Sequence, residues 1–138
     1  MIDMSSVDQK NKSILLVDDD KFIVDVFNIK FSEAGFDFHC AFSGPEAISI
    51  LEQGLNPDVI MTNIMMPGID GFQMIKEIKE KGLATDSLII ILSNMGQEDD
   101  IKRATSLGVN GYITKGSSTP SEVLEKVSAL IRKKQEEE

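Results

Sequence analysis

Several residue types are scarce in this sequence, and each shortage excludes a class of protein. The 138 residues include one cysteine, no tryptophan and four prolines. Because the lone Cys40 cannot form an internal disulfide, a disulfide scaffold is excluded and a reducing compartment is expected. Cys40 lies in the mostly apolar run 38–42, which favours its packing as a small hydrophobe over a role as a redox-sensing thiol.

Positive charge is also scarce. The sequence has 14 Lys and Arg against 23 Asp and Glu, a formal net charge of −9. Without a basic stripe, the chain is not expected to bind nucleic acid or an anionic membrane surface. No apolar run approaches the roughly 18 residues of a transmembrane helix, and residues 1–12 lack the pattern of a secretory signal. We therefore expect a cytoplasmic protein.

The length and the alternation of patterns indicate one compact domain. Residues 1–12 are predicted to be a flexible arm, 13–133 the folded domain and 134–138 a charged tail. The run 14–17 (ILLV) is continuously apolar, as in a strand buried on both faces of a parallel sheet. Further strands are predicted at 36–42, 59–62, 88–92 and 109–114.

A helical pattern follows each of these five strands. In the first, Phe22, Val26 and Ile29 recur at helical spacing and are predicted to form its apolar face. Alternating strands and helices predict an α/β fold, and right-handed crossovers leave few topologies. The fold expected at this length is a flavodoxin-like (βα)5 three-layer sandwich with a parallel sheet of order 2-1-3-4-5.

Polar residues stand where four of the predicted strands end. The first strand ends in the acidic run 18–20, the third in Asn63, the fourth in Ser93 and the fifth in Lys115. In open parallel sheets, ligands bind beyond the carboxyl ends of the strands, so these groups should converge. Carboxylate and amide oxygens suit Mg²⁺, while a hydroxyl and an ammonium can hold phosphoryl oxygens. The alternative is a solvated loop, and Asp20 is predicted simply to cap the following helix.

With these residues in place, the chain resembles the receiver domain of bacterial two-component response regulators, in particular the free-standing chemotaxis type. The resemblance rests on the segments 14–20, 57–71, 92–94 and 111–115, of which the run MMPGIDG at 65–71 is the most specific. It covers about residues 12–133.

The resemblance implies a metal site and a position for the phosphoryl group. Asp18, Asp19, the side chain at position 63 and the backbone carbonyl of Met65 would hold Mg²⁺. The phospho-acceptor position is occupied by Asn63, where the family has aspartate. A neutral carboxamide is a poor nucleophile, so phosphorylation should fail there. The lost negative charge should also weaken Mg²⁺ binding, and neighbouring Thr62 should point to the opposite face of the strand.

The resemblance also assigns the remaining polar positions. Ser93 and Lys115 would bind phosphoryl oxygens, and Ser93 and Tyr112 would act as the switch. The alternatives are a serine that ends a strand, a solvated lysine and a tyrosine fixed by packing. Gly116 stands where the family usually has proline. Because a cis bond before glycine is costly, we expect a trans peptide and a more flexible loop after Lys115.

The leading hypothesis is a signalling module and not an enzyme. Its partners would be a histidine kinase or phosphotransfer protein and a downstream protein target, contacted by a monomer or weak dimer, since no effector domain is expected after the last helix. Asn63 is either a deliberate replacement of aspartate or the mark of a natural pseudo-receiver, and the intact neighbouring positions favour replacement.

Two other functions use the same fold. A Mg²⁺-dependent phosphohydrolase would need a nucleophilic carboxylate at position 63, which the sequence lacks. A flavin carrier would need phosphate donors in the first loop, where the acidic run 18–20 stands instead.

Overall fold

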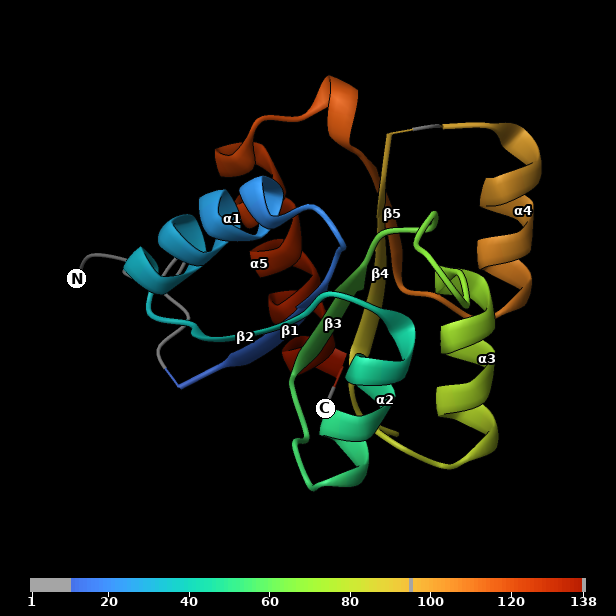
Figure 1. Ribbon diagram of the computed structural model, residues 1–138. Coiled ribbons are helices and arrows are strands. Elements are labelled where there is room, and N and C mark those ends of the chain that lie inside the picture. Colours follow the sequence, from blue (N-terminus) through green and yellow to red (C-terminus); the bar gives the residue numbers. More distant parts are fainter. Residues whose placement is uncertain (1–10, 95, 138) are drawn as a thin grey trace.

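A computed structural model describes residues 11–94 and 96–137 (Figure 1). Strands and helices alternate along this part of the chain. The strands are β1 (Ser13–Val17), β2 (Asp37–Ala41), β3 (Val59–Thr62), β4 (Leu88–Ser93) and β5 (Gly111–Thr114). The helices are α1 (Lys21–Glu33), α2 (Gly44–Glu52), α3 (Gly71–Glu80), α4 (Glu98–Ser106) and α5 (Pro120–Glu137), with a 3₁₀ turn, η1, at Lys115–Ser117.

The strands form one parallel sheet in the order β2-β1-β3-β4-β5. The predicted α/β fold and strand order are therefore confirmed. Helices α1 and α5 cover one face of the sheet, and α2, α3 and α4 cover the other (Figure 1). Because the chain crosses over between strands through these helices, the carboxyl ends of all strands meet at the same edge.

Two hydrophobic cores lie on the two faces of the sheet, and alternation along the strands supplies both. In β1, Ile14 and Leu16 enter the core beneath α1 and α5, while Leu15 and Val17 enter the core beneath α2 and α3. All four are fully buried. Burying a side chain of this size contributes about 1.5–3 kcal/mol. The central strands therefore fix the position of the residues that follow their carboxyl ends.

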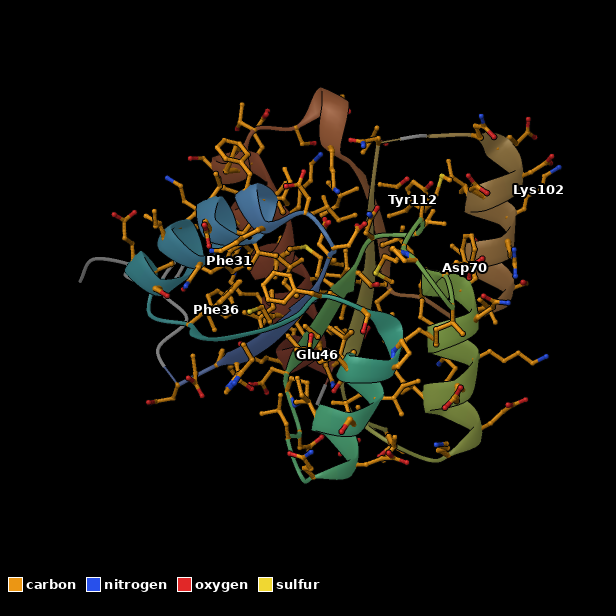
Figure 2. The ribbon with its side chains drawn as sticks, in the orientation of Figure 1. Phe31, Phe36, Glu46, Asp70, Lys102 and Tyr112 are labelled. Carbon is orange, nitrogen blue, oxygen red and sulfur yellow. The ribbon has the colours of Figure 1, made fainter. Side chains whose placement is uncertain are left out.

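The predicted apolar face of α1 was wrong. Phe22 and Ile29 are 73% and 64% exposed, whereas Val24, Phe27 and Phe31 are buried. Phe31 packs edge-on against the Phe36 ring beneath the helix (Figure 2). Both sets of apolar residues have helical spacing, so periodicity alone did not decide which set faces the sheet.

Helix α5 runs past residue 133, after which the charged tail was predicted to begin. Of the predicted arm, only Asn11 and Lys12 fall inside the described residues. Residues 134–137, predicted as a tail, continue α5, and Lys134 donates a hydrogen bond to the carbonyl of Asp86. Charged Lys and Glu residues are good helix formers, which accounts for the extra turn.

Burial raises the pKa of the Cys40 thiol, in keeping with its predicted packing role.

Candidate functional site

The polar strand ends predicted from the sequence meet at one edge of the sheet. The last residues of β1 and β3 are register partners, as are the last residues of β4 and β5. Asp18 and Asn63, which directly follow β1 and β3, therefore lie side by side. The backbone N–H of Asn63 donates a hydrogen bond to the carbonyl of Val17 at 2.9 Å. Ser93 and Lys115 follow from the next two strands. The sheet register thus assembles residues that are far apart in sequence.

Asp18 and Lys115 form a nearly buried ion pair. Lys115 Nζ lies 2.8 Å from Asp18 Oδ2, and the two side chains are 12% and 1% exposed. The other carboxylate oxygen, Oδ1, accepts the backbone N–H of Asp20 at 3.0 Å. A buried carboxylate without such partners is strongly unfavourable, so Lys115 compensates a charge that the fold places inside the protein.

The three consecutive aspartates have three different surroundings. Asp18 is buried, whereas Asp19 is exposed to solvent. Asp20 caps α1 by accepting the backbone N–H groups of Phe22 and Ile23, as predicted for this residue. Asp18 therefore lies inside the protein with both oxygens paired, Asp19 faces solvent at the polar edge, and Asp20 serves the helix.

Asn63 bonds back to its own loop through both ends of its carboxamide. Its Nδ2 donates to the carbonyl of Met65 at 3.0 Å, and its Oδ1 accepts the N–H of Ile64 at 2.9 Å. An aspartate at this position could make the second bond but not the first, because a carboxylate has no donor. The Met65 carbonyl is one of the oxygens that the resemblance assigned to the metal.

A groove of about 480 Å³ opens beside Asn63. It runs between the loop after β3 and helix α4, and its lining includes Asn63, Met65, Ser93 and Asp100. Ser93 is buried at 4% exposure, and Met65 is 69% exposed at the rim. The groove is therefore continuous with the polar strand ends and accessible from solvent.

Two residues that line this groove were not predicted from the sequence. Arg103 on α4 places its guanidinium 4.5 Å from the centre of the Phe72 ring. Asp70 caps α3 in a reciprocal capping box with Gln73 and lies at the start of that helix (Figure 2). The D-x-x-Q spacing is a signal for the cap. The Arg103 contact has no sequence signal, because its partner lies 31 positions away on another helix.

Gly71 holds the loop after β3 close to the sheet. Its N–H donates to the carbonyl of Ile64 at 2.8 Å, and a Cβ built on it would collide with the carbonyl oxygen of Asn63. Glycine is therefore required there for steric reasons. This explains one position of the 65–71 run that supported the resemblance.

The remaining predicted positions lie on or beside the same edge. Tyr112 is half-buried on β5 and packs against the core on the α4 side of the sheet (Figure 2). Thr62 is buried and donates its hydroxyl to the carbonyl of Asn63 at 2.9 Å, away from solvent. The peptide bond between Lys115 and Gly116 is trans, as expected for glycine.

The oxygens at this edge fit a hard cation in part. Within residues 11–94 and 96–137, no three His, Cys, Asp or Glu side chains are grouped to hold a metal ion. The edge offers the carboxylates of Asp18 and Asp19 and the carbonyl of Met65, which are ligands of the type that Mg²⁺ takes alongside water. Asn63 adds only a neutral oxygen that already accepts a hydrogen bond.

None of the helices in the described part of the chain has the length and apolarity needed to span a membrane.

The family model of the response regulator receiver domain matches residues 14–128. That segment contains all four polar strand ends described above, and of the five strands it leaves out only Ser13, the first residue of β1.

Solved structures show the same similarity. The receiver domain of a Francisella response regulator is 31% identical, with a TM-score of 0.79 over 90% of this chain and 99% of that one. The response regulator TrrA of Thermotoga maritima, in complex with Mg²⁺ and BeF, is 31% identical, with a TM-score of 0.74 over 86% and 98% of the two chains. The chemotaxis protein CheY4 of Vibrio cholerae, at 22% identity and a TM-score of 0.80 over 86% and 98%, shares the fold.

Proposed function

Because this chain belongs to the response regulator receiver domain family, we propose that it is a signalling module whose phospho-acceptor position is blocked by Asn63. The observation that carries the proposal is the pair of hydrogen bonds made by the Asn63 carboxamide, one of them to the Met65 carbonyl at 3.0 Å. The amide nitrogen has its lone pair delocalised and is engaged as a donor. It therefore does not attack phosphorus, whereas a carboxylate oxygen at the same place would.

The proposed metal is Mg²⁺, held by Asp18, Asp19 and the carbonyl of Met65. When bound, Mg²⁺ would neutralise the charge of a phosphoryl group at this edge. The support is the donor set, together with the Mg²⁺ complex of the 31%-identical TrrA. Asn63 weakens the site in two ways, since it removes one negative charge and its Nδ2 already satisfies the Met65 carbonyl.

The proposed ligands of the phosphoryl group are Ser93 and Lys115. Ser93 ends β4, which pairs with the strand before Asn63, and Lys115 follows β5, one strand further along the sheet. Lys115 would exchange part of its ion pair with Asp18 for the incoming anion. We further propose that Ser93 and Tyr112 form the switch. Tyr112 supports this by its place on β5, half-buried on the side of the sheet that carries α4.

The proposed partners are a histidine kinase or phosphotransfer protein as donor and a second protein as target. Signalling would then proceed through protein contacts and not through turnover of a substrate. In the present chain these contacts would be made without phosphorylation, because the acceptor is missing. We expect the native gene to encode aspartate at position 63, since the other predicted site positions are intact.

The direct test restores the acceptor. The Asn63→Asp variant, incubated with acetyl phosphate and Mg²⁺, should gain one phosphoryl group per chain by mass spectrometry, and EDTA should abolish the gain. The unchanged protein should show no labelling at position 63. Equal labelling of the two proteins, or no labelling of the variant with Mg²⁺ present, would overturn the proposal.

A further inference from the structure

Two adjacent hollows lie at the amino end of the sheet, opposite the edge that carries Asn63. In Figure 1 the last turns of α5 lie beside the lower end of the sheet, whereas β4 reaches its carboxyl end at the top. The hollows have volumes of about 510 and 260 Å³, and both linings include Asp86, Leu88 and Lys134. Together they form the amino-end pocket. Neither lining includes a residue that was assigned to the metal, phosphoryl or switch positions.

The floor of the amino-end pocket is apolar and belongs to the core. Leu88 and Ile131 are 7% and 4% exposed and pack in the core beneath α1 and α5, and Leu130 is half-buried against it. The carbonyl of buried Pro57 accepts the hydroxyl of Ser87, which ties the start of β3 to the start of β4. The larger hollow falls in the range of about 300–1,000 Å³ that is usual for small-molecule sites. A fixed apolar floor of this kind can receive the flat face of a ring.

Three lysines line the pocket without a carboxylate partner. Lys133 lines the larger hollow, Lys12 lines the smaller one, and Lys134 lines both. None of the three forms an ion pair in the described part of the chain, whereas four other lysines there do. Lys134 donates instead to the backbone carbonyl of Asp86. In a chain with a net charge of −9, unpaired cations gathered at one pocket point to an anionic ligand.

A carboxamide adds a directed hydrogen-bond donor to the larger hollow. Asn110 Oδ1 accepts the backbone N–H of Ile89 at 2.8 Å, which fixes the orientation of the side chain. The Nδ2 group of Asn110 has no acceptor within the described residues. The Thr85 hydroxyl lines the same hollow. Amide and hydroxyl donors beside ammonium groups suit the oxygens of a phosphate.

The lining also contains carboxylates, which a simple anion site would not need. Asp86 and Glu137 are exposed and line the larger hollow. The carboxylate of Asp58, by contrast, is occupied, since its Oδ2 accepts the backbone N–H of Ser13 at 2.8 Å. A carboxylate repels phosphate but accepts hydrogen bonds from the hydroxyls of a ribose. A ligand with phosphate, sugar and ring therefore matches the cations, the carboxylates and the apolar floor together.

We propose that the amino-end pocket binds a nucleoside phosphate. The phosphates would lie against Lys133, Lys134 and the Nδ2 group of Asn110. The ribose hydroxyls would donate to Asp86, and the base would lie on Leu130. An acidic peptide would meet the repulsion of the carboxylates without offering the sugar hydroxyls that they accept. The inference goes beyond the blocked acceptor site, because no residue of that edge takes part.

The test titrates the full chain with ADP and, separately, with pyrophosphate. EDTA is present so that no metal ion draws phosphate to the edge that carries Asn63. In NMR spectra, the backbone amides of residues 85–88 and the side-chain amide of Asn110 should shift with ADP. The backbone amides of Asn63 and Lys115 should not. Shifts confined to those two residues, or no binding of ADP at millimolar concentration, would overturn the proposal.

Two isosteric variants separate a nucleotide site from a general anion site. Asn110→Asp keeps the acceptor for the N–H of Ile89 but loses the donor, so ADP should bind at least about tenfold more weakly. Asp86→Asn should weaken ADP binding, because the ribose loses an anionic acceptor. The same variant should strengthen pyrophosphate binding, because a repulsive charge is removed. Equal weakening of both probes by Asp86→Asn would contradict the ribose contact.

The double variant Lys133→Gln with Lys134→Gln should weaken the binding of both probes. Its matched control is Lys76→Gln with Lys79→Gln, which makes the same change of charge at exposed positions of α3 and should leave both affinities unchanged. Asn63→Asp should bind ADP as the unchanged protein does, which separates this test from that of the acceptor site. Equal losses for the two lysine pairs would show a nonspecific effect of charge and would refute the site.

Discussion

The ion pair between Asp18 and Lys115 joins residues that lie 97 positions apart and places both charges in a nearly buried setting. Removing one partner of such a pair leaves the other charge buried and unsatisfied. The pair therefore has a structural role in addition to any contact with a phosphoryl group, and the two roles can be separated by stability measurements without a ligand.

Replacing Lys115 by methionine should lower the free energy of unfolding by about 3 kcal/mol, because the Asp18 carboxylate loses its counter-ion. Adding Asp18→Asn to that variant should recover most of the loss, since no buried charge remains. Urea denaturation of the two single variants and the double variant measures this coupling. The control is Lys21→Met, whose ion pair with Asp25 is exposed on both sides (76% and 57%) and should cost under about 0.5 kcal/mol. Equal losses for the two lysine variants would contradict the argument.

The helices differ in how many side chains they bury against the sheet and in how completely their N-termini are capped. Helix α3 buries five residues and begins with a complete capping box. Helix α4 buries only Ala104, and its N-cap residue, Gln97, makes no side-chain capping bond. Since helix stability in proteins comes mainly from the packing of one face, α4 should be the least stable helix.

Hydrogen exchange should therefore be fastest in α4 among the helices, when the first and last turns are left out. Arg103 links α4 to α3 through its contact with the Phe72 ring. The variant Arg103→Ala should increase exchange in α4 further and leave α3 unchanged. Lys102→Ala, which alters an exposed neighbour on the same helix, is the control. Slower exchange in α4 than in α3 would refute this account.

At the scale of the whole molecule, the negative net charge of the chain affects its stability. The net charge is −9, and the variant Asn63→Asp changes it to −9 − 1 = −10. The new charge would lie beside Asp18 and Asp19, and the hydrogen bond from position 63 to the Met65 carbonyl would be lost. The present chain should therefore be the more stable of the two without a metal.

Thermal melts in EDTA should show the Asn63→Asp variant melting about 3–5 °C lower, which for a domain of this size corresponds to roughly 1 kcal/mol. Salt should reduce the difference by screening. Mg²⁺ stabilises a protein by binding its folded state. Because the restored carboxylate strengthens the site, addition of Mg²⁺ should raise the melting temperature of the variant more than that of the unchanged protein. A higher melting temperature for the variant in EDTA would contradict this expectation.

The two apolar sets on α1 show where sequence reasoning ended. Strand order followed from the continuous apolar runs and the handedness of crossovers, and the strand ends followed from the runs themselves. The spacing of Phe22, Val26 and Ile29 is as helical as that of the buried set, so the pattern had two solutions. Packing against the sheet decided which of the two apolar sets is buried, because only one side of the helix can face the sheet. The contact of Arg103 with Phe72 was hidden for a similar reason, since it joins two helices across the groove.

What the amino-acid sequence alone determined is the order of elements and the identity of the polar groups at the strand ends, because periodicity and turn residues act over short stretches of chain. Asn63 was visible at once as a neutral residue in an acidic setting. Only the tertiary structure decided what these groups contact: Lys115 with Asp18, and Asn63 with the Met65 carbonyl. Those contacts depend on sheet register and burial, which are set by the packing of the whole domain and not by any local pattern.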